Sequence, residues 1–208
     1  MTVTTRIALA SALALVSFGS VVTAQAPAPA NPNPAAIHSG SYAVESSHTR
    51  VGFSVSHMGF SDWFGEFTGA TGSLKIDPRH PEAARVDVTI PTASVVTTNA
   101  KLDDELRSAD WFDAQAHPTI RFVSTRIVKT GARSARITGD LTFHGVTRPV
   151  TLNASFNAGG VNPLDKAYTI GFNASTHIRR SDFGVKTYLP LIGDDVAIRI
   201  SAAFESRA

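Results

Sequence analysis

The side chains that most often carry chemistry in proteins are sparse and scattered in this chain. It has 208 residues and no cysteine, which excludes disulfides, thiolate metal ligands and cysteine nucleophiles. The seven histidines show no metal-ligand spacing, such as two on one helix face. They are His38, His48, His57, His80, His117, His144 and His177. We therefore expect no metal site and no cofactor, and we expect these histidines to form hydrogen bonds in turns and at strand ends.

Three polar motifs could be catalytic or anion-binding. Residues 59–63, Gly-Phe-Ser-Asp-Trp, begin like a nucleophile elbow but lack its final glycine. The acidic run at residues 103–105 is explained by the exposed first turn of a helix, where the helix dipole favours negative charge. Arg179 and Arg180 could hold an anionic head group at the mouth of a cavity, or could be an ordinary exposed pair. Nothing here supports catalysis, so the sequence predicts a protein that is not an enzyme.

Apolar residues from position 42 onward recur mainly with a period of two, which is typical of strands with one buried face. The period continues through residues 51–57, 64–76, 85–90, 120–122, 137–143, 150–156, 168–174 and 196–204. Gly65, Gly69 and Gly72 interrupt the second stretch and predict bends or bulges there. Eight amphipathic antiparallel strands can form a sandwich or a barrel, and their length and internal glycines favour an eight-stranded barrel.

A single segment, residues 100–109, has helical spacing instead. Asn99 precedes it and can cap its first turn. Asp103 and Arg107 are four residues apart and predict an ion pair on one helix face. We therefore expect an all-β barrel with one short helix between two groups of strands.

The first 24 residues are typical of a signal peptide, with Arg6 followed by an apolar run that is short for a membrane span; the alternative is an N-terminal membrane anchor. Cleavage is expected before Gln25. Residues 25–39 are rich in proline and alanine and predict a tether, which leaves residues 40–208 as the folded domain. The formal net charge is only +2, so we expect no nucleic acid partner. The polar strand faces also argue against an integral membrane protein.

Phenylalanine accounts for 12 of the 17 aromatic residues. Those on the apolar strand faces include Phe53, Phe122, Phe143, Phe156, Phe172 and Phe204. They could form a packed core, or they could line an apolar tunnel for a lipid, and periodicity alone does not separate the two.

Four sequence blocks carry a resemblance to a known family. They are HTRVGFSVSHMGFS at residues 48–61 with GEF at 65–67, LRSADWFDAQAHPTIRFVS at 106–124, ITGDLTFHGVTRPV at 137–150 and IRRSDFG at 178–184. In these blocks the chain resembles the YceI-like family of periplasmic polyisoprenoid-binding proteins, which have lipocalin-like barrels. The resemblance covers residues 42–204.

The resemblance implies a periplasmic binding protein whose barrel holds a polyisoprenoid or another long-chain apolar lipid, including quinone-like molecules. The ligand-binding residues it implies are Val51, Phe53, Val55, His57, Phe67, Trp111, Phe112, Phe122, Leu141, Phe143, Phe172 and Phe183. The helical segment with Trp111 and Phe112 would close one end. A homodimer and a membrane redox or lipid-handling partner are compatible with this function. The alternative is a non-catalytic, partner-binding barrel with a packed core.

Overall fold

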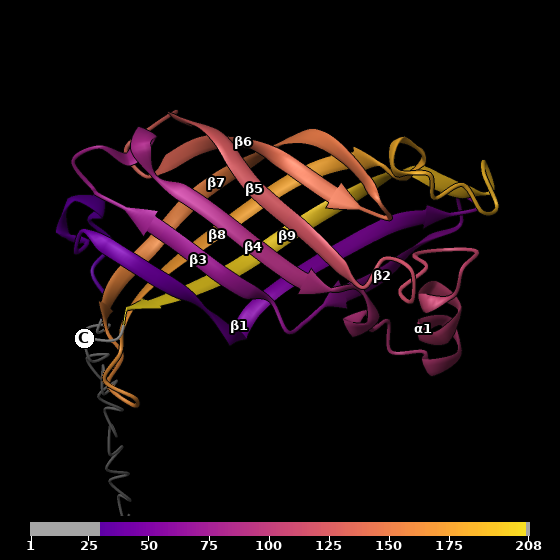
Figure 1. Cartoon of the computed structure of the whole chain (residues 1–208), viewed down its shortest axis with the longest axis horizontal. Helices are drawn as coiled ribbons and strands as arrows, with labels where there is room; N and C mark the ends of the chain where they lie inside the picture. The colour runs from indigo at the N-terminus through magenta and orange to yellow at the C-terminus, as the bar shows by residue number, and fades with distance from the viewer. Residues whose placement is uncertain (1–29, 207–208) are drawn as a thin grey trace, which may run out of the picture.

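Nine strand segments and one α-helix make up residues 30–206, the part of the chain that the computed structural model describes (Figure 1). Residues 1–29 and 207–208 lie outside the described residues, and with them the predicted signal peptide and the start of the predicted tether. The strands are β1 (Gly40–His57), β2 (Ser61–Phe67), β3 (Thr71–Ile76), β4 (Arg85–Pro91), β5 (Thr119–Lys129), β6 (Ser134–Phe143), β7 (Val146–Val161), β8 (Tyr168–Arg179) and β9 (Ile192–Ser206). The helices are α1 (Ala100–Arg107) and the 3₁₀ turns η1 (Pro34–Ala36), η2 (Pro81–Ala83), η3 (Thr92–Ser94) and η4 (Arg180–Phe183).

The strands form a closed antiparallel barrel. Neighbours follow the order β3-β4-β5-β6-β7-β8-β9, and β1 closes the ring by pairing with both β3 and β9. β2 and β3 are two parts of one interrupted strand: β3 pairs with the beginning of β1, and β2 pairs with its end. The interruption includes Gly69, whose φ of 69° is left-handed and favours glycine. The eight-stranded barrel and its glycine-marked break are therefore confirmed.

Two clusters of buried apolar side chains occupy the two ends of the barrel. The cluster near α1 includes Leu106, Trp111 and Phe112. The cluster at the opposite end includes Tyr42 and Phe156. Burial, assisted by the nearby Tyr168, raises the pKa of Tyr42 to about 12, and its hydroxyl donates to the His38 carbonyl oxygen at 2.6 Å.

Helix α1 begins as predicted, because the Asn99 side chain accepts a hydrogen bond from the Leu102 amide. The predicted Asp103–Arg107 pair is wrong. Asp103 accepts hydrogen bonds from both the amide and the hydroxyl of Thr97, at 2.7 and 2.6 Å, so its carboxylate faces the preceding loop. Arg107 pairs with Asp104 instead, at 3.0 Å. Neither α1 nor any other helix within residues 30–206 has the length and hydrophobicity needed to cross a membrane.

Ordered packing begins before residue 40, the predicted start of the folded domain. Asn31 exchanges backbone hydrogen bonds with Gly159, and Ile37 is buried in the cluster with Tyr42. The His38 ring stacks on Tyr168 with centroids 3.9 Å apart. The latter part of the predicted tether is therefore packed against the barrel, because its apolar and aromatic side chains find partners there.

Candidate functional site: an apolar cavity inside the barrel

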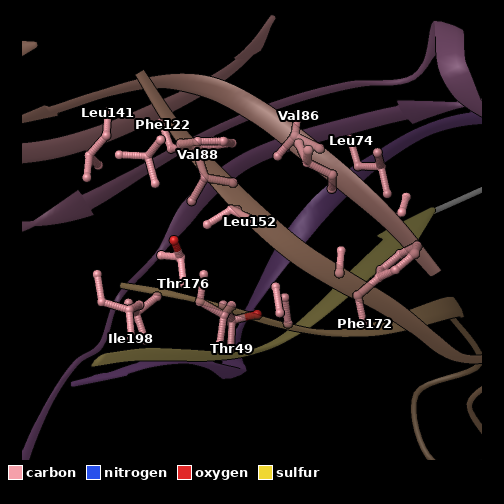
Figure 2. A pocket seen from close by; sticks show the side chains of 18 of the residues that line it. Thr49, Leu74, Val86, Val88, Phe122, Leu141, Leu152, Phe172, Thr176 and Ile198 are labelled. Carbon is pink, nitrogen blue, oxygen red and sulfur yellow. The ribbon is translucent and has the colours of Figure 1, made fainter. Parts of the chain in front are cut away.

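A cavity of about 350 Å³ occupies the barrel interior. Every strand contributes lining side chains, and nearly all are aliphatic or aromatic (Figure 2). Leu74, Val88, Phe122 and Ile198 point into the same space from four different strands. Ligand pockets in proteins typically have volumes of roughly 300–1,000 Å³ and mostly apolar walls, so this cavity can hold a small apolar molecule.

The cavity is long and narrow, because it follows the barrel axis. On β9 its lining residues alternate from Val196 to Phe204, which is eight residue steps. At about 3.3 Å per residue the distance along the strand is roughly 26 Å. With the tilt of about 40° usual in barrels, the length along the axis is roughly 20 Å. An extended chain fits this shape better than a compact ring system.

The two ends of the cavity differ. At one end its lining includes the exposed turn between β5 and β6, from Gly131 to Ser134, together with Lys129 and residues next to η1 and η2. At the other end the lining residues Leu106, Trp111 and Phe112 are buried. The first end is therefore an open mouth, and the buried side chains of α1 and the segment after it fill the second, where the resemblance placed them. Helix α1 lies at one end of the barrel (Figure 1).

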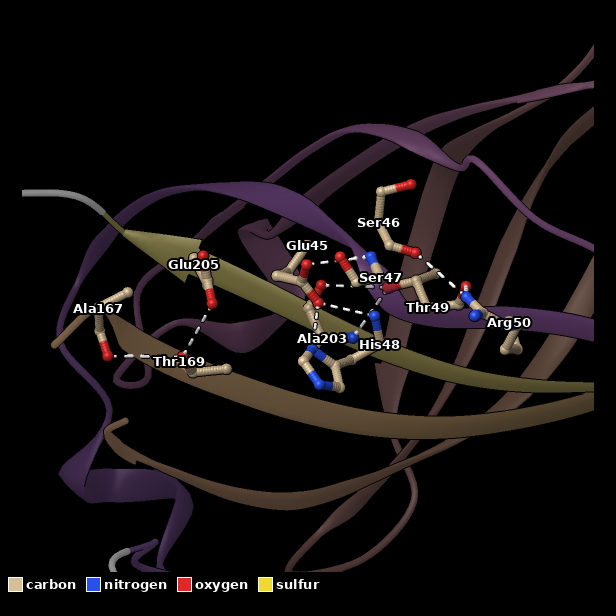
Figure 3. A network of polar contacts seen from close by, with 10 residues as sticks. All are labelled: Glu45, Ser46, Ser47, His48, Thr49, Arg50, Ala167, Thr169, Ala203 and Glu205. Atoms are coloured by element: carbon tan, nitrogen blue, oxygen red, sulfur yellow. Dashed lines mark hydrogen bonds and ion pairs between the residues drawn. The ribbon is translucent and has the colours of Figure 1, made fainter. Parts of the chain in front are cut away.

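A bulge in β1 shapes the wall. Between Glu45 and Arg50, β1 advances five residues while β9 advances two. The Glu45 carboxylate accepts hydrogen bonds from the amides of Ser47 and His48 and contacts the His48 ring at 2.6 Å (Figure 3). Burial alone would raise the pKa of Glu45, but these hydrogen bonds outweigh it and lower the pKa to about 2. At neutral pH the Glu45 side chain is therefore ionised, and its hydrogen bonds stabilise the bulge.

Two threonine hydroxyls face the cavity but are already engaged with the wall. The Thr49 hydroxyl donates to the Ala203 carbonyl and accepts from the Ala203 amide. The Thr176 hydroxyl donates to the Thr151 carbonyl at 2.9 Å. Both threonines appear in Figure 2 among apolar neighbours. Their hydroxyl protons are therefore not available to a ligand, and the middle of the cavity is apolar in effect.

The two adjacent arginines that could bind an anion have different environments. Arg179 is exposed and pairs with Asp182 at 3.3 Å. Arg180 is 5% exposed and lines the closed end of the cavity, not its mouth. Desolvation lowers the pKa of the Arg180 guanidinium, and the nearby Asp194 offsets part of this effect. The two arginines predicted to act together therefore lie in different environments: Arg179 is exposed and Arg180 is buried.

The structure brings ten of the twelve predicted site residues into the cavity lining. They are Val51, Phe53, Val55, Phe67, Trp111, Phe112, Phe122, Leu141, Phe143 and Phe172. His57 and Phe183 are not in the lining. The pairing of β1 with β9 shifts after Val55, and the His57 ring packs edge-on against Trp63. Phe183 lies on η4 and packs behind Phe143, with ring centroids 5.8 Å apart, so it fills the closed end.

Several lining residues were not among those predicted. The aliphatic ones follow the same alternation as the aromatic residues, so the period of two was a sufficient signal; examples are Val88, Ile90, Ile120, Leu152, Ile178, Ile198 and Ile200. Thr49 and Thr176 carried no such signal, because threonine is also common on exposed strand faces.

The histidines do not form a metal centre in the described part of the chain. His117 and His144 come closest, with ring centroids 5.0 Å apart, and His144 Nδ1 lies 3.0 Å from the Phe183 carbonyl. No three histidine, aspartate or glutamate side chains within residues 30–206 converge as metal ligands.

The fold and the cavity together define a lipocalin-like barrel, a class of small antiparallel barrels whose interior is wide enough for one small ligand. The chain belongs to the family of YceI-like domains, which matches residues 42–204.

The chain is also similar in sequence to UPF0312 proteins and in structure to several solved barrels. The UPF0312 protein of Pseudomonas putida is 41% identical over 142 residues, which are 68% of this chain and 73% of the relative. BcnA of Burkholderia cenocepacia superposes with a TM-score of 0.70 at 26% identity, covering 77% of this chain and 98% of BcnA. A domain of Saccharophagus degradans described as polyisoprenoid binding has a TM-score of 0.64 at 14% identity, covering 80% and 98%. At that identity the last comparison supports the fold alone.

Proposed function

We propose that this protein is a periplasmic carrier that holds a polyisoprenoid, or another long-chain apolar lipid such as a quinone-like molecule, in its barrel. The observation that carries the proposal is the long apolar cavity between the two end clusters. Membership of the YceI-like family, and the polyisoprenoid-binding description of a protein with the same fold, point to the same ligand class. Residues 1–24, with the features of a signal peptide, support export.

The cavity length sets the expected chain length. An isoprene unit adds four carbon–carbon bonds of about 1.5 Å, which project to roughly 5 Å along an extended chain. A cavity of about 20 Å therefore holds roughly four units. Each unit buries five carbons, worth about 4 kcal/mol before costs. Four units supply roughly 16 kcal/mol, compared with an association cost of about 4–15 kcal/mol. Hydrophobic burial of a chain of this length is thus sufficient for binding.

The alternative of a partner-binding barrel with a packed core has less support, because side chains leave the interior unfilled. A homodimer and a membrane redox or lipid-handling partner remain predictions from the sequence. A carrier needs some way to exchange its cargo, and the open mouth between the β5–β6 turn and η1 is the route we favour.

Native mass spectrometry of the mature protein from periplasmic extract, followed by solvent extraction, tests the proposal. We expect an additional mass that extracts as an isoprenoid or fatty chain. A titration of the Trp63→Phe variant with prenols of one to six isoprene units then measures the length dependence through the fluorescence of Trp111. We expect affinity to rise up to about four units and then to level off. A protein that purifies without ligand and binds no prenol or quinone would contradict the proposal and favour the packed, partner-binding alternative.

A further inference from the structure

Arg180 places a fixed positive charge at the closed end of the cavity, among the apolar side chains of Leu106, Trp111 and Phe112. Its guanidinium donates to three carbonyl oxygens: Nε to Gly193 at 2.8 Å, and the two terminal nitrogens to Val185 at 3.2 Å and Ile192 at 2.9 Å. The guanidinium carbon also lies 5.4 Å from the centroid of the Trp111 ring. These contacts hold the group in one orientation beside the cavity.

The charge has no carboxylate partner within ion-pair distance in the described part of the chain. The nearby Asp194 uses its carboxylate on the amide and hydroxyl of Ser181, at 2.9 and 2.7 Å. A guanidinium remains protonated even when it is buried, and buried charges are normally paired. Three of its five N–H groups have the partners given above, which leaves two for a ligand.

The other cations that line the cavity do not need a bound anion to balance their charge. Lys129 and Arg133 are exposed at the mouth, where water solvates their charge. Arg133 also donates to the carbonyl oxygens of Phe156 and Asn157. An exposed cation needs no counter-charge, whereas burial of Arg180 costs free energy that a bound anion would recover.

We propose that Arg180 binds the head group of the ligand, that the ligand enters head first, and that this head is the carboxylate of a long-chain acid. A carboxylate carries one negative charge and accepts two N–H groups side by side, which matches one guanidinium. A diphosphate would leave excess negative charge buried in an apolar site, and an alcohol would not neutralise the cation. The inference rests on the proposed function, since it takes the chain to lie in the cavity, and it adds the identity and orientation of the head.

Ligand orientation can be measured through Trp111. The chain has two tryptophans, so Trp63→Phe leaves Trp111 as the single fluorophore. Hexadecanoic acid carrying bromine next to the carboxyl group, or at the terminal carbon, is then titrated and quenching is compared at saturation. We expect the bromine next to the carboxyl group to quench Trp111 more strongly. Stronger quenching by the terminal bromine means that the tail enters first and overturns the inference. If neither acid binds, nor any prenol, the proposed function itself fails.

Head-group selectivity separates a binding role of Arg180 from a purely structural one. At pH 8 we expect the wild-type protein to bind hexadecanoic acid about tenfold to a hundredfold more tightly than hexadecanol. Arg180→Met should abolish this preference, and Arg180→Lys should retain part of it and serves if the methionine variant does not fold. Arg179→Met is the matched control, since Arg179 is exposed, and it should keep the preference. Equal affinities of the wild-type protein for the acid and the alcohol would refute the inference.

Discussion

A single side chain placed halfway along the cavity should divide it. Ala174 lies on β8 with its small side chain in the cavity lining, and it pairs with Ile200, the midpoint of the Val196–Phe204 stretch of β9. In Ala174→Trp the indole ring would occupy the channel there. Each remaining half would be roughly 10 Å long and would hold about two isoprene units. A twenty-carbon prenol should then lose the burial of about two units, roughly 8 kcal/mol before costs.

Because area-based estimates are upper limits, we expect a measured loss of at least about a hundredfold in affinity for the twenty-carbon prenol. The ten-carbon prenol should bind the variant and the wild type alike. Ser175→Trp is the control: it adds the same ring to the neighbouring residue, whose side chain is on the outer face beside Arg199. Isothermal titration with circular dichroism as a folding check gives the comparison. A folded Ala174→Trp protein that binds the twenty-carbon prenol as tightly as wild type would refute the cavity as the binding site.

Three further variants test the cavity wall, the bulge in β1 and the N-terminal cap of α1. Phe122→Asp puts an unpaired carboxylate in the cavity, so prenol titrations should show binding lost at pH 8 and regained on acidification, because burial raises the carboxyl pKa. Glu45→Gln should reduce the free energy of unfolding at pH 7 by about 1–2 kcal/mol. The folded pKa of about 2 is below the ordinary 4.5, so in urea titrations this difference should persist above pH 4.5 and disappear as the pH falls toward 2; a pH-independent difference contradicts it. Asn99→Ala removes the α1 cap and should cost about 1 kcal/mol in urea unfolding, and an unchanged midpoint would show that the cap contributes nothing.

Within each uninterrupted strand, the sequence alone was enough to assign the inward face. Val51, Phe53 and Val55 alternate along β1, and all three line the cavity. The reason is local: successive side chains on a pleated strand point to opposite faces, so apolar alternation identifies the buried side. The same property predicted the number of strands, and the glycines at positions 65, 69 and 72 predicted the break between β2 and β3. The short helix was equally local, because its apolar spacing and its Asn99 cap lie within one segment.

Alternation failed where strands bulge. Val44 and Val51 both line the cavity although they are seven residues apart, because the β1 bulge reverses the inward face between them. Phe122 and Ile127 show the same reversal across the register shift in β5. His57 keeps the register of Val55 with β2 and packs against Trp63, so it shares that strand face but lies beyond the cavity lining. A bulge depends on the partner strand, so a sequence pattern in one strand cannot place it.

The tertiary structure alone decided whether the interior is filled and where its charge lies. A packed core and a ligand cavity are both lined by strands with the same apolar alternation. The width of the closed barrel decides whether the side chains fill its interior, and here they leave a cavity. Arg179 and Arg180 are adjacent and chemically identical, yet the turn η4 exposes one and buries the other at the closed end. The cavity volume and the burial of Arg180 arise from contacts between segments far apart in the chain, whereas the periodicity of a sequence depends only on residues that are close together in it.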